Sequence, residues 1–302
     1  MRNPYEIWQR AVQFIPLMMV VWCAGCTQHI GRPETDAPTR AASGTYTLHQ
    51  NIVYTPVSWP QRLEADVYVP AGVGPFPGVL VIHGGGWQGG TRADMNHIAK
   101  RLVQRGYTAV NISYRFAPAS HFPAQIQDLQ QAVRWMRQNA AAYRIDPQWI
   151  GVFGYSAGGH LAALLGTIRP GDGFDDKADD PSTRIQAVVV GGAPTDLRKF
   201  RGGRLVPQFL GTTIDKNPQV FAHASPIVHV SSDDPPMFLY HGSLDTLVDI
   251  SHATDMKQAL DAANVPAELY IVRGLGHIAV FIINDSAIEA GIAFLDRWLR
   301  SH

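Results

Sequence analysis

Cysteine is scarce in this chain and charge is balanced, and each of these features narrows the possible functions. Only two of the 302 residues are cysteine, and both come early, so the body of the chain is predicted to fold without a disulfide. The 25 basic and 25 acidic residues give a formal net charge of zero. Without a basic cluster, the sequence does not predict nucleic-acid binding. No group of histidine, aspartate and cysteine has metal-ligand spacing, so we predict no metal and no other cofactor.

The first 26 residues have the organisation of an export signal. Arg2 and Arg10 form a basic start, and the apolar run 11–22 has the length of a signal-peptide core but not of a membrane span. Small residues then lead to Cys26. The pattern resembles a bacterial lipoprotein signal, which implies cleavage before Cys26, a lipid anchor on it, and an exported protein in the periplasm or at the cell surface. A plain secretory signal and an uncleaved anchor stay open as alternatives.

Ser156 lies in the motif on which the functional interpretation depends. Residues 154–159 read Gly-Tyr-Ser-Ala-Gly-Gly, after the apolar run 149–153 and before the helix-prone residues 160–165. A G-x-S-x-G segment between a strand and a helix is a nucleophile elbow, whose tight turn exposes the serine hydroxyl. The helix that follows directs its unpaired N–H groups toward an oxyanion formed at the serine. A purely structural turn is the alternative.

A glycine-rich loop upstream supports the nucleophile. Residues 83–87 read His-Gly-Gly-Gly-Trp and follow the apolar run 79–82. Loops of this HGGG type supply backbone N–H groups to an oxyanion hole. Taken alone, the segment also fits a glycine-rich turn at the end of a strand. The two motifs in this order favour the catalytic interpretation.

A serine nucleophile also needs an imidazole to take its proton and a carboxylate to orient that imidazole. In α/β-hydrolases the chain order is serine, then acid, then histidine. Asp245 follows the predicted strand 236–240, and His277 follows the predicted strand 267–272. Both positions lie at the carboxyl ends of strands, where open α/β sheets place their sites. We therefore predict that Ser156, Asp245 and His277 converge.

Other acids and imidazoles fit structural roles better. Asp196 is predicted to line the pocket or cap a turn, and Asp249 to cap a helix. His241 and His252 lie too near Asp245 in the sequence to be its partner. His160 falls inside the helix after the elbow, where a satisfied core histidine is expected.

Strands and helices alternate along the rest of the chain. With 46% hydrophobic and 17% charged residues, the length suits one sizeable α/β domain. This alternation predicts a mostly parallel sheet with helices on both faces. Residues 27–45 are predicted to form a flexible tether and 46–302 the catalytic domain. The irregular segment 197–234 is predicted to form a lid or one wall of the pocket, and 278–299 a closing helix.

Four motifs in order, at residues 83–87, 114–124, 154–159 and 241–245, resemble the α/β-hydrolase esterases related to hormone-sensitive lipase. They are most similar to a branch of bacterial carboxylesterases that includes feruloyl and acetyl-xylan esterases. Tyr155 stands where this pattern usually has Asp, which favours a more open pocket. The resemblance implies an α/β-hydrolase fold with a mostly parallel eight-stranded sheet and helices on both faces. It also implies the following roles: Ser156 as nucleophile, His277 as base, Asp245 as orienting acid, and the N–H groups of Gly85, Gly86 and Ala157 as oxyanion donors.

The function that these motifs predict is that of a serine carboxylesterase. Its substrate would be a small-molecule or carbohydrate-linked ester with a short or aryl acyl group, in a pocket lined by Trp87, Tyr155, Ile278 and Phe281. The same machinery also fits an arylformamidase or a serine peptidase. A hydrolase-fold surface lipoprotein without catalytic activity is the alternative outside the enzymes.

Overall fold

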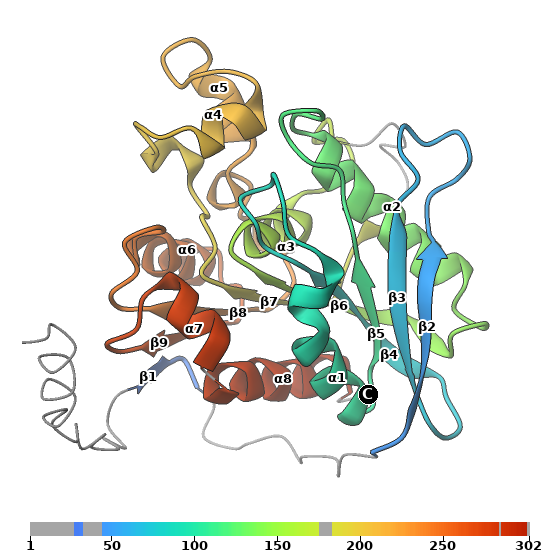
Figure 1. The fold of residues 1–302 in the computed structure, drawn as a ribbon. Coiled ribbons are helices and arrows are strands. Elements are labelled where there is room, and N and C mark those ends of the chain that lie inside the picture. The colour runs from blue at the N-terminus through green and yellow to red at the C-terminus, as the bar shows by residue number, and fades with distance from the viewer. Residues whose placement is uncertain (1–26, 33–43, 175–182, 284, 301–302) are drawn as a thin grey trace, which may run out of the picture.

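A nine-stranded sheet forms the centre of the computed structural model (Figure 1). The structure describes residues 27–32, 44–174, 183–283 and 285–300, so the predicted export signal and Cys26 lie outside the described residues. The strand order is β1-β9-β8-β7-β6-β4-β5-β3-β2. The strands are β1 (Thr27–Ile30), β2 (Tyr46–Val53), β3 (Glu64–Pro70), β4 (Phe76–Ile82), β5 (Thr108–Ile112), β6 (Ile145–Tyr155), β7 (Ala187–Gly191), β8 (Met237–Gly242) and β9 (Ala267–Val272).

The six strands β4 to β9 run parallel, which confirms the predicted mostly parallel sheet. At one side β3 pairs antiparallel with β5 and β2 with β3. At the other side β1 pairs antiparallel with β9. The strand count is therefore nine rather than the predicted eight.

The prediction of a flexible tether over residues 27–45 is wrong for its first residues. Thr27–Ile30 form β1, with Thr27 opposite Val272 and Ile30 opposite Leu269. Only one of these four residues is half-buried and the others are exposed, so the strand has no apolar pattern by which the sequence could predict it. A side-chain contact holds this edge strand instead, because Nε2 of His29 lies 2.7 Å from the buried Glu268 carboxylate.

Two apolar layers cover the two faces of the sheet. Side chains of α2, α3 and α6 form one core, and side chains of α1, α7 and α8 form the other. Successive side chains of β4 alternate between the two cores: Leu80 and Ile82 lie in the first, and Val79 and Val81 lie in the second. The helices are α1 (Asn96–Gln104), α2 (Ala124–Gln138), α3 (Ala157–Thr167), α6 (Ser251–Ala262), α7 (His277–Ile283) and α8 (Asp285–Leu299).

The closing helix predicted over 278–299 is two helices. α7 and α8 meet at a bend of 72°. Among the described residues, no single helix has the length and apolar character to cross a membrane, and this bent pair meets those two criteria only when its members are combined.

The irregular segment 197–234 forms small helices above the sheet, at the top of Figure 1. They are η4 (Leu197–Lys199), α4 (Leu205–Leu210), α5 (Pro218–His223) and η5 (Pro226–Val228). Phe209 and Phe221 anchor the segment, since neither exposes any surface. The Phe209 ring stacks on Trp87 with ring centres 4.5 Å apart. This contact joins α4 to the glycine-rich loop and places the segment beside the elbow.

Candidate active site

Three side chains from three separate strand ends meet at one edge of the sheet. The Ser156 hydroxyl lies 2.8 Å from Nε2 of His277, and Nδ1 of His277 lies 2.6 Å from the Asp245 carboxylate. Asp245 and His277 are both buried, so water is largely excluded from the contact between the carboxylate and the imidazole. A proton on Nδ1 that is donated to Asp245 leaves Nε2 free to accept from the serine. The structure thus brings together the three residues that the sequence predicts to converge.

The turn at Ser156 has the strained backbone of a nucleophile elbow. Ser156 adopts φ 54° and ψ −122°, which an L-residue rarely does. The flanking glycines are sterically required: a Cβ at Gly154 would lie 2.2 Å from the Gly158 carbonyl oxygen, and one at Gly158 would lie 2.3 Å from that of Ile82. β6 therefore passes directly into α3 with the hydroxyl at the tip of the turn.

Hydrogen bonds keep Asp245 ionised. Oδ1 accepts from the backbone N–H groups of Leu247 at 2.9 Å and Val248 at 2.8 Å, while Oδ2 faces His277. Burial by itself would raise the pKa of this carboxyl. The hydrogen bonds from His241, His277 and Val248 outweigh burial and hold the pKa of Asp245 well below its ordinary value.

His241 is a contact of Asp245 that the sequence interpretation missed. Its Nε2 lies 3.3 Å from Oδ2 of Asp245 and 2.8 Å from the carbonyl oxygen of Val248. Because a carbonyl only accepts, Nε2 carries the proton and donates to both oxygens. The expectation that His241 is not the imidazole that Asp245 orients toward the serine is confirmed, because His277 takes that place. His241 nevertheless reaches the same carboxylate, because β8 ends at Gly242 and the loop folds back over its last residues. The i, i+4 spacing of His241 and Asp245 predicts a contact only on a helix, and these residues lie on a strand and a loop, so no sequence signal indicated this contact.

Tyr155 holds the backbone of His277. Its hydroxyl donates to the backbone carbonyl of His277 at 2.5 Å, and its ring packs against Phe281 with ring centres 4.7 Å apart. Burial, with the charge of Asp245, raises the pKa of Tyr155 well above its ordinary value, so the phenol remains a donor. The residue next to the nucleophile therefore fixes the start of α7.

The predicted oxyanion donors lie near the serine. Ala157 is the first residue of α3, so its N–H has no partner within the helix. Gly86 lines the same cavity as Ser156 and Ala157, and Gly85 precedes it with φ 106°, a conformation suited to glycine. A Cβ at Gly84 would lie 3.3 Å from the Ser156 Cβ, so the loop approaches the nucleophile closely.

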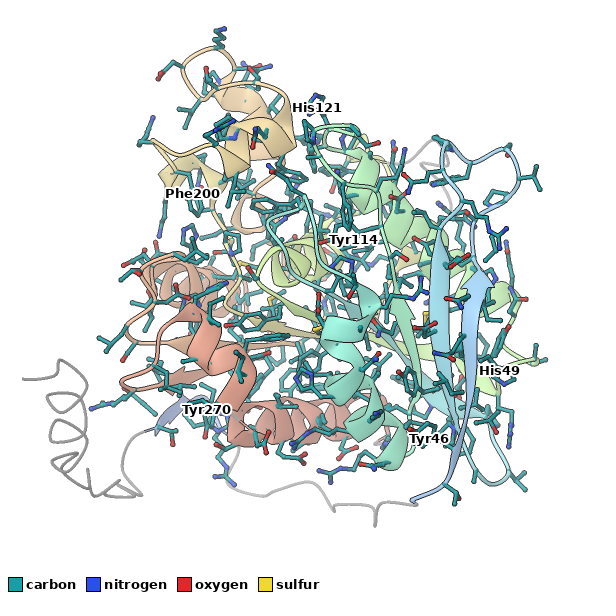
Figure 2. All side chains as sticks on the ribbon, in the orientation of Figure 1. Tyr46, His49, Tyr114, His121, Phe200 and Tyr270 are labelled. Carbon is teal, nitrogen blue, oxygen red and sulfur yellow. The ribbon has the colours of Figure 1, made fainter. Side chains whose placement is uncertain are left out.

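His83 and Tyr114 brace this loop from behind. Nδ1 of His83 lies 2.7 Å from the Gly84 carbonyl oxygen, and the imidazole stacks on Tyr114 with ring centres 4.5 Å apart. Tyr114, labelled near the centre of Figure 2, donates from its hydroxyl to the His83 carbonyl at 3.0 Å. These contacts hold the loop through the side chain and carbonyl of His83 and the carbonyl of Gly84, and none of them uses the N–H groups of Gly85 and Gly86.

A cavity of about 260 Å3 opens beside Ser156. Trp87 lines it as predicted, but three predicted lining residues do not. Tyr155 and Phe281 pack together in the core below, and Ile278 is 62% exposed on the outer side of α7. The reason is the direction of α7, which turns away from the cavity after His277. Residues of the segment 197–234 and of the Asp245 loop replace them: Phe200, Gly202, Gly203, Arg204, Leu205, Val206, Leu247 and Val248.

The remaining candidates have structural contacts. Asp196 caps η4 by accepting from the N–H of Arg198, and Asp249 accepts from the N–H of Ser251 at the start of α6. His160 accepts from Nε1 of Trp87 and donates to the Ala224 carbonyl, and burial lowers its pKa to about 4. Phe200, labelled in Figure 2, stacks on His252 with ring centres 5.1 Å apart. The described residues contain no group of three or more His, Cys, Asp or Glu that could hold a metal ion.

Comparison with known proteins identifies the family. A family model described as BD-FAE matches residues 65–260, which is more than half of the chain. The chain belongs to the BD-FAE family. Curated proteins similar to this chain are matched over part of their length: "Esterase LipC" of Mycobacterium tuberculosis is 32% identical over 213 residues, which cover 67% of this chain and 53% of LipC. The chain spans about half the length of the curated relatives it matches.

Solved structures agree with this BD-FAE family assignment. A carbohydrate esterase from gut microbiota has 26% identity and a TM-score of 0.74, covering 87% of this chain and 98% of the other. Esterase 2 of Thermogutta terrifontis, solved with butyrate, has 25% identity and a TM-score of 0.70, covering 88% and 98%. The same esterase phosphorylated by paraoxon has a TM-score of 0.67 at 26% identity, covering 83% and 92%. The fold is that of an α/β-hydrolase.

Proposed function

We propose that this protein is a serine carboxylesterase. The observation that carries the proposal is the continuous hydrogen-bonded series from Ser156 through His277 to Asp245, at 2.8 and 2.6 Å. A binding module has no use for a buried carboxylate–imidazole pair aimed at a strained serine. The names of the relatives, LipC and the gut and Thermogutta esterases, support the same reaction class.

The geometry accounts for each step of ester hydrolysis. The Ser156 oxygen attacks the ester carbonyl while Nε2 of His277 takes the hydroxyl proton. Asp245 stabilises the imidazolium that forms, and the N–H groups of Gly85, Gly86 and Ala157 stabilise the oxyanion. The imidazolium gives its proton to the leaving alcohol, which departs and leaves an acyl-serine. Water, deprotonated by His277, then attacks the acyl carbonyl and releases the acid and the free serine.

The cavity favours short or aryl acyl groups. Its walls are mostly apolar, with Trp87, Leu205, Val206 and Leu247 around Ser156. A volume of about 260 Å3 suits acyl groups of the size of acetyl, butyryl or an aromatic acid rather than a long chain. That the Thermogutta relative was solved with butyrate agrees with this size. We therefore propose acetyl- and feruloyl-type esters as the substrate class.

An ester and amide panel with purified full-length protein tests the assignment. p-Nitrophenyl acetate, p-nitrophenyl butyrate and methyl ferulate should be hydrolysed, and Ser156→Ala should reduce kcat by roughly 10⁵-fold or more. The matched control is Ser251→Ala, which changes an exposed hydroxyl away from the cavity. N-formyl anilines and peptide anilides in the same panel test the amide alternative. Amidase activity without esterase activity, or turnover that Ser156→Ala leaves unchanged, would overturn the proposal.

We further propose that the protein is exported as a lipoprotein anchored through Cys26. The support is the order of basic residues, apolar run and small residues in the first 26 positions. Mass spectrometry of the membrane fraction should find a mature N-terminus at Cys26 bearing acyl chains. Cleavage elsewhere, or an unmodified Cys26, would contradict this second proposal without affecting the first.

A further inference from the structure

Half of the large apolar side chains that are exposed in the described part of the chain lie around the active-site edge of the sheet. Each of these six is at least 43% exposed. Contiguous apolar surface of this kind marks an interaction site on a folded protein. The six residues, here called the apolar rim, are Leu205 of α4, Leu244 and Leu247 of the loop after β8, and Ile278, Ile282 and Ile283 of α7.

The rim is one surface rather than scattered positions. α7 turns Val280 inward and leaves Ile278 and Ile282, one helical turn apart, on its outer side. The N–H of Leu244 donates to the carbonyl of Leu275 at 3.0 Å, which joins the loop after β8 to the start of α7. On the other side of His277, Leu247 and Leu205 line the cavity together. Leu205 and Leu247 thus lie at the cavity, while the α7 residues of the apolar rim lie outside it and are joined to the rim through the bond between Leu244 and Leu275.

The register of β1 brings the N-terminal part of the chain to the same edge. Thr27 pairs with Val272, the last residue of β9, so β1 starts at the end of the sheet where β9 leads into His277. The side chain of Gln28 accepts from Arg273 at 3.2 Å. Cys26, which directly precedes Thr27, is therefore attached to the folded domain at the end of β9 that leads into α7.

We propose that the apolar rim docks on a lipid bilayer, with the cavity beside Ser156 facing the membrane. The lipid anchor proposed on Cys26 is the reason to choose a bilayer over a protein partner, and the inference rests on that proposal: an anchor attached directly before β1 would hold this edge of the sheet next to the lipid. Isoleucine and leucine side chains suit the boundary between headgroups and acyl chains. The exposed Arg201 and Arg204, in the loop that lines the cavity mouth, suit lipid phosphates. The proposal concerns binding and holds whether or not the site hydrolyses esters.

Photolabelling from within the bilayer tests the orientation directly. Full-length protein carrying Ser156→Ala is reconstituted into phosphatidylcholine–phosphatidylglycerol vesicles that contain a phosphatidylcholine with a diazirine in its acyl chain. After irradiation, mass spectrometry should find the segments 244–247 and 278–283 labelled about tenfold more than Val57 and Val73, which are also apolar, are more exposed than any residue of the rim, and belong to other loops.

Two variants separate docking from a change in folding. Ile282→Ser with Ile283→Ser should lower labelling of 244–247 several-fold, whereas Val57→Ser with Val73→Ser should leave it unchanged, with thermal unfolding midpoints of both variants close to the parent. Labelling confined to residues before Thr27, or spread evenly over the surface, would overturn the proposal. A dimer whose two copies cross-link through α7, with the rim unlabelled by lipid, would overturn it in favour of a second copy of the chain.

Discussion

Replacing Asp245 by asparagine gives the sharpest test of the proposed mechanism, because the structure dictates how the new side chain must lie. Oδ1 of Asp245 accepts two backbone N–H groups, at 2.9 and 2.8 Å. In Asp245→Asn the amide oxygen must keep that place, so the NH₂ group points at Nδ1 of His277. Nδ1 then has to accept, and its proton moves to Nε2. An Nε2–H cannot accept the proton of Ser156.

The size of the effect follows from the loss of a correctly protonated base. We expect kcat for p-nitrophenyl acetate to fall by about 10⁴-fold, which corresponds to about 5 kcal/mol in the activation free energy. The NH₂ group also faces the donating Nε2 of His241, 3.3 Å from the present oxygen, so the variant gains an unfavourable donor–donor contact. The matched control is Asp249→Asn, an exposed cap of α6 four residues along, which should stay within about twofold of the parent.

The assay is a pH series of kcat/KM on folded protein, with near-ultraviolet circular dichroism to establish that the fold persists. Activity of Asp245→Asn should recover partly at high pH, where hydroxide replaces the missing base. If a folded Asp245→Asn protein kept a tenth or more of the parent activity near neutral pH, the assigned role of Asp245 would be refuted.

Three further predictions follow from contacts of the site. Tyr155→Phe removes the hydroxyl bonded to the His277 carbonyl, so we expect kcat to fall about tenfold with KM unchanged, measured by steady-state kinetics; an altered KM alone would contradict a positioning role. Val206→Trp fills the apolar cavity, so the ratio of butyrate to acetate hydrolysis should fall several-fold, and an unchanged ratio would place the acyl group elsewhere. The lowered pKa of Asp245 adds stability that is fully present above the ordinary carboxyl pKa of about 4 and is lost as pH falls through the lower pKa of the folded state. The stability difference between parent and Asp245→Asn, from urea unfolding, should therefore shrink below about pH 4, and a constant difference would argue against the shift.

The residues that form the catalytic series could be predicted from the sequence because their arrangement depends on short stretches of chain. The glycines around Ser156 are needed within a single turn, and the order of motifs at residues 83–87, 154–159, Asp245 and His277 follows the order of strand ends. Parallel strands bring their carboxyl ends to one edge, so convergence of the three side chains follows from strand order without any knowledge of packing.

Contacts between segments that are far apart in the sequence could not be predicted in the same way. The cavity wall depends on α4, which Phe209 fixes against Trp87 from more than a hundred residues away. The direction of α7 after His277 places Ile278 outside the cavity. β1 forms because a mostly polar tetrapeptide pairs with β9 at the edge of the sheet and its His29 contacts the Glu268 carboxylate. The secondary-structure propensities of the residues carry no information about these three contacts.

The sequence by itself determined the fold class, the nucleophile elbow and the three residues that meet there, because turn sterics and strand order operate over short stretches of chain. Only the tertiary structure decided which side chains surround the acyl cavity, that His241 shares the Asp245 carboxylate, and that β1 starts beside α7. Those outcomes depend on how side chains far apart in the sequence pack together, and packing is a property of the whole folded chain.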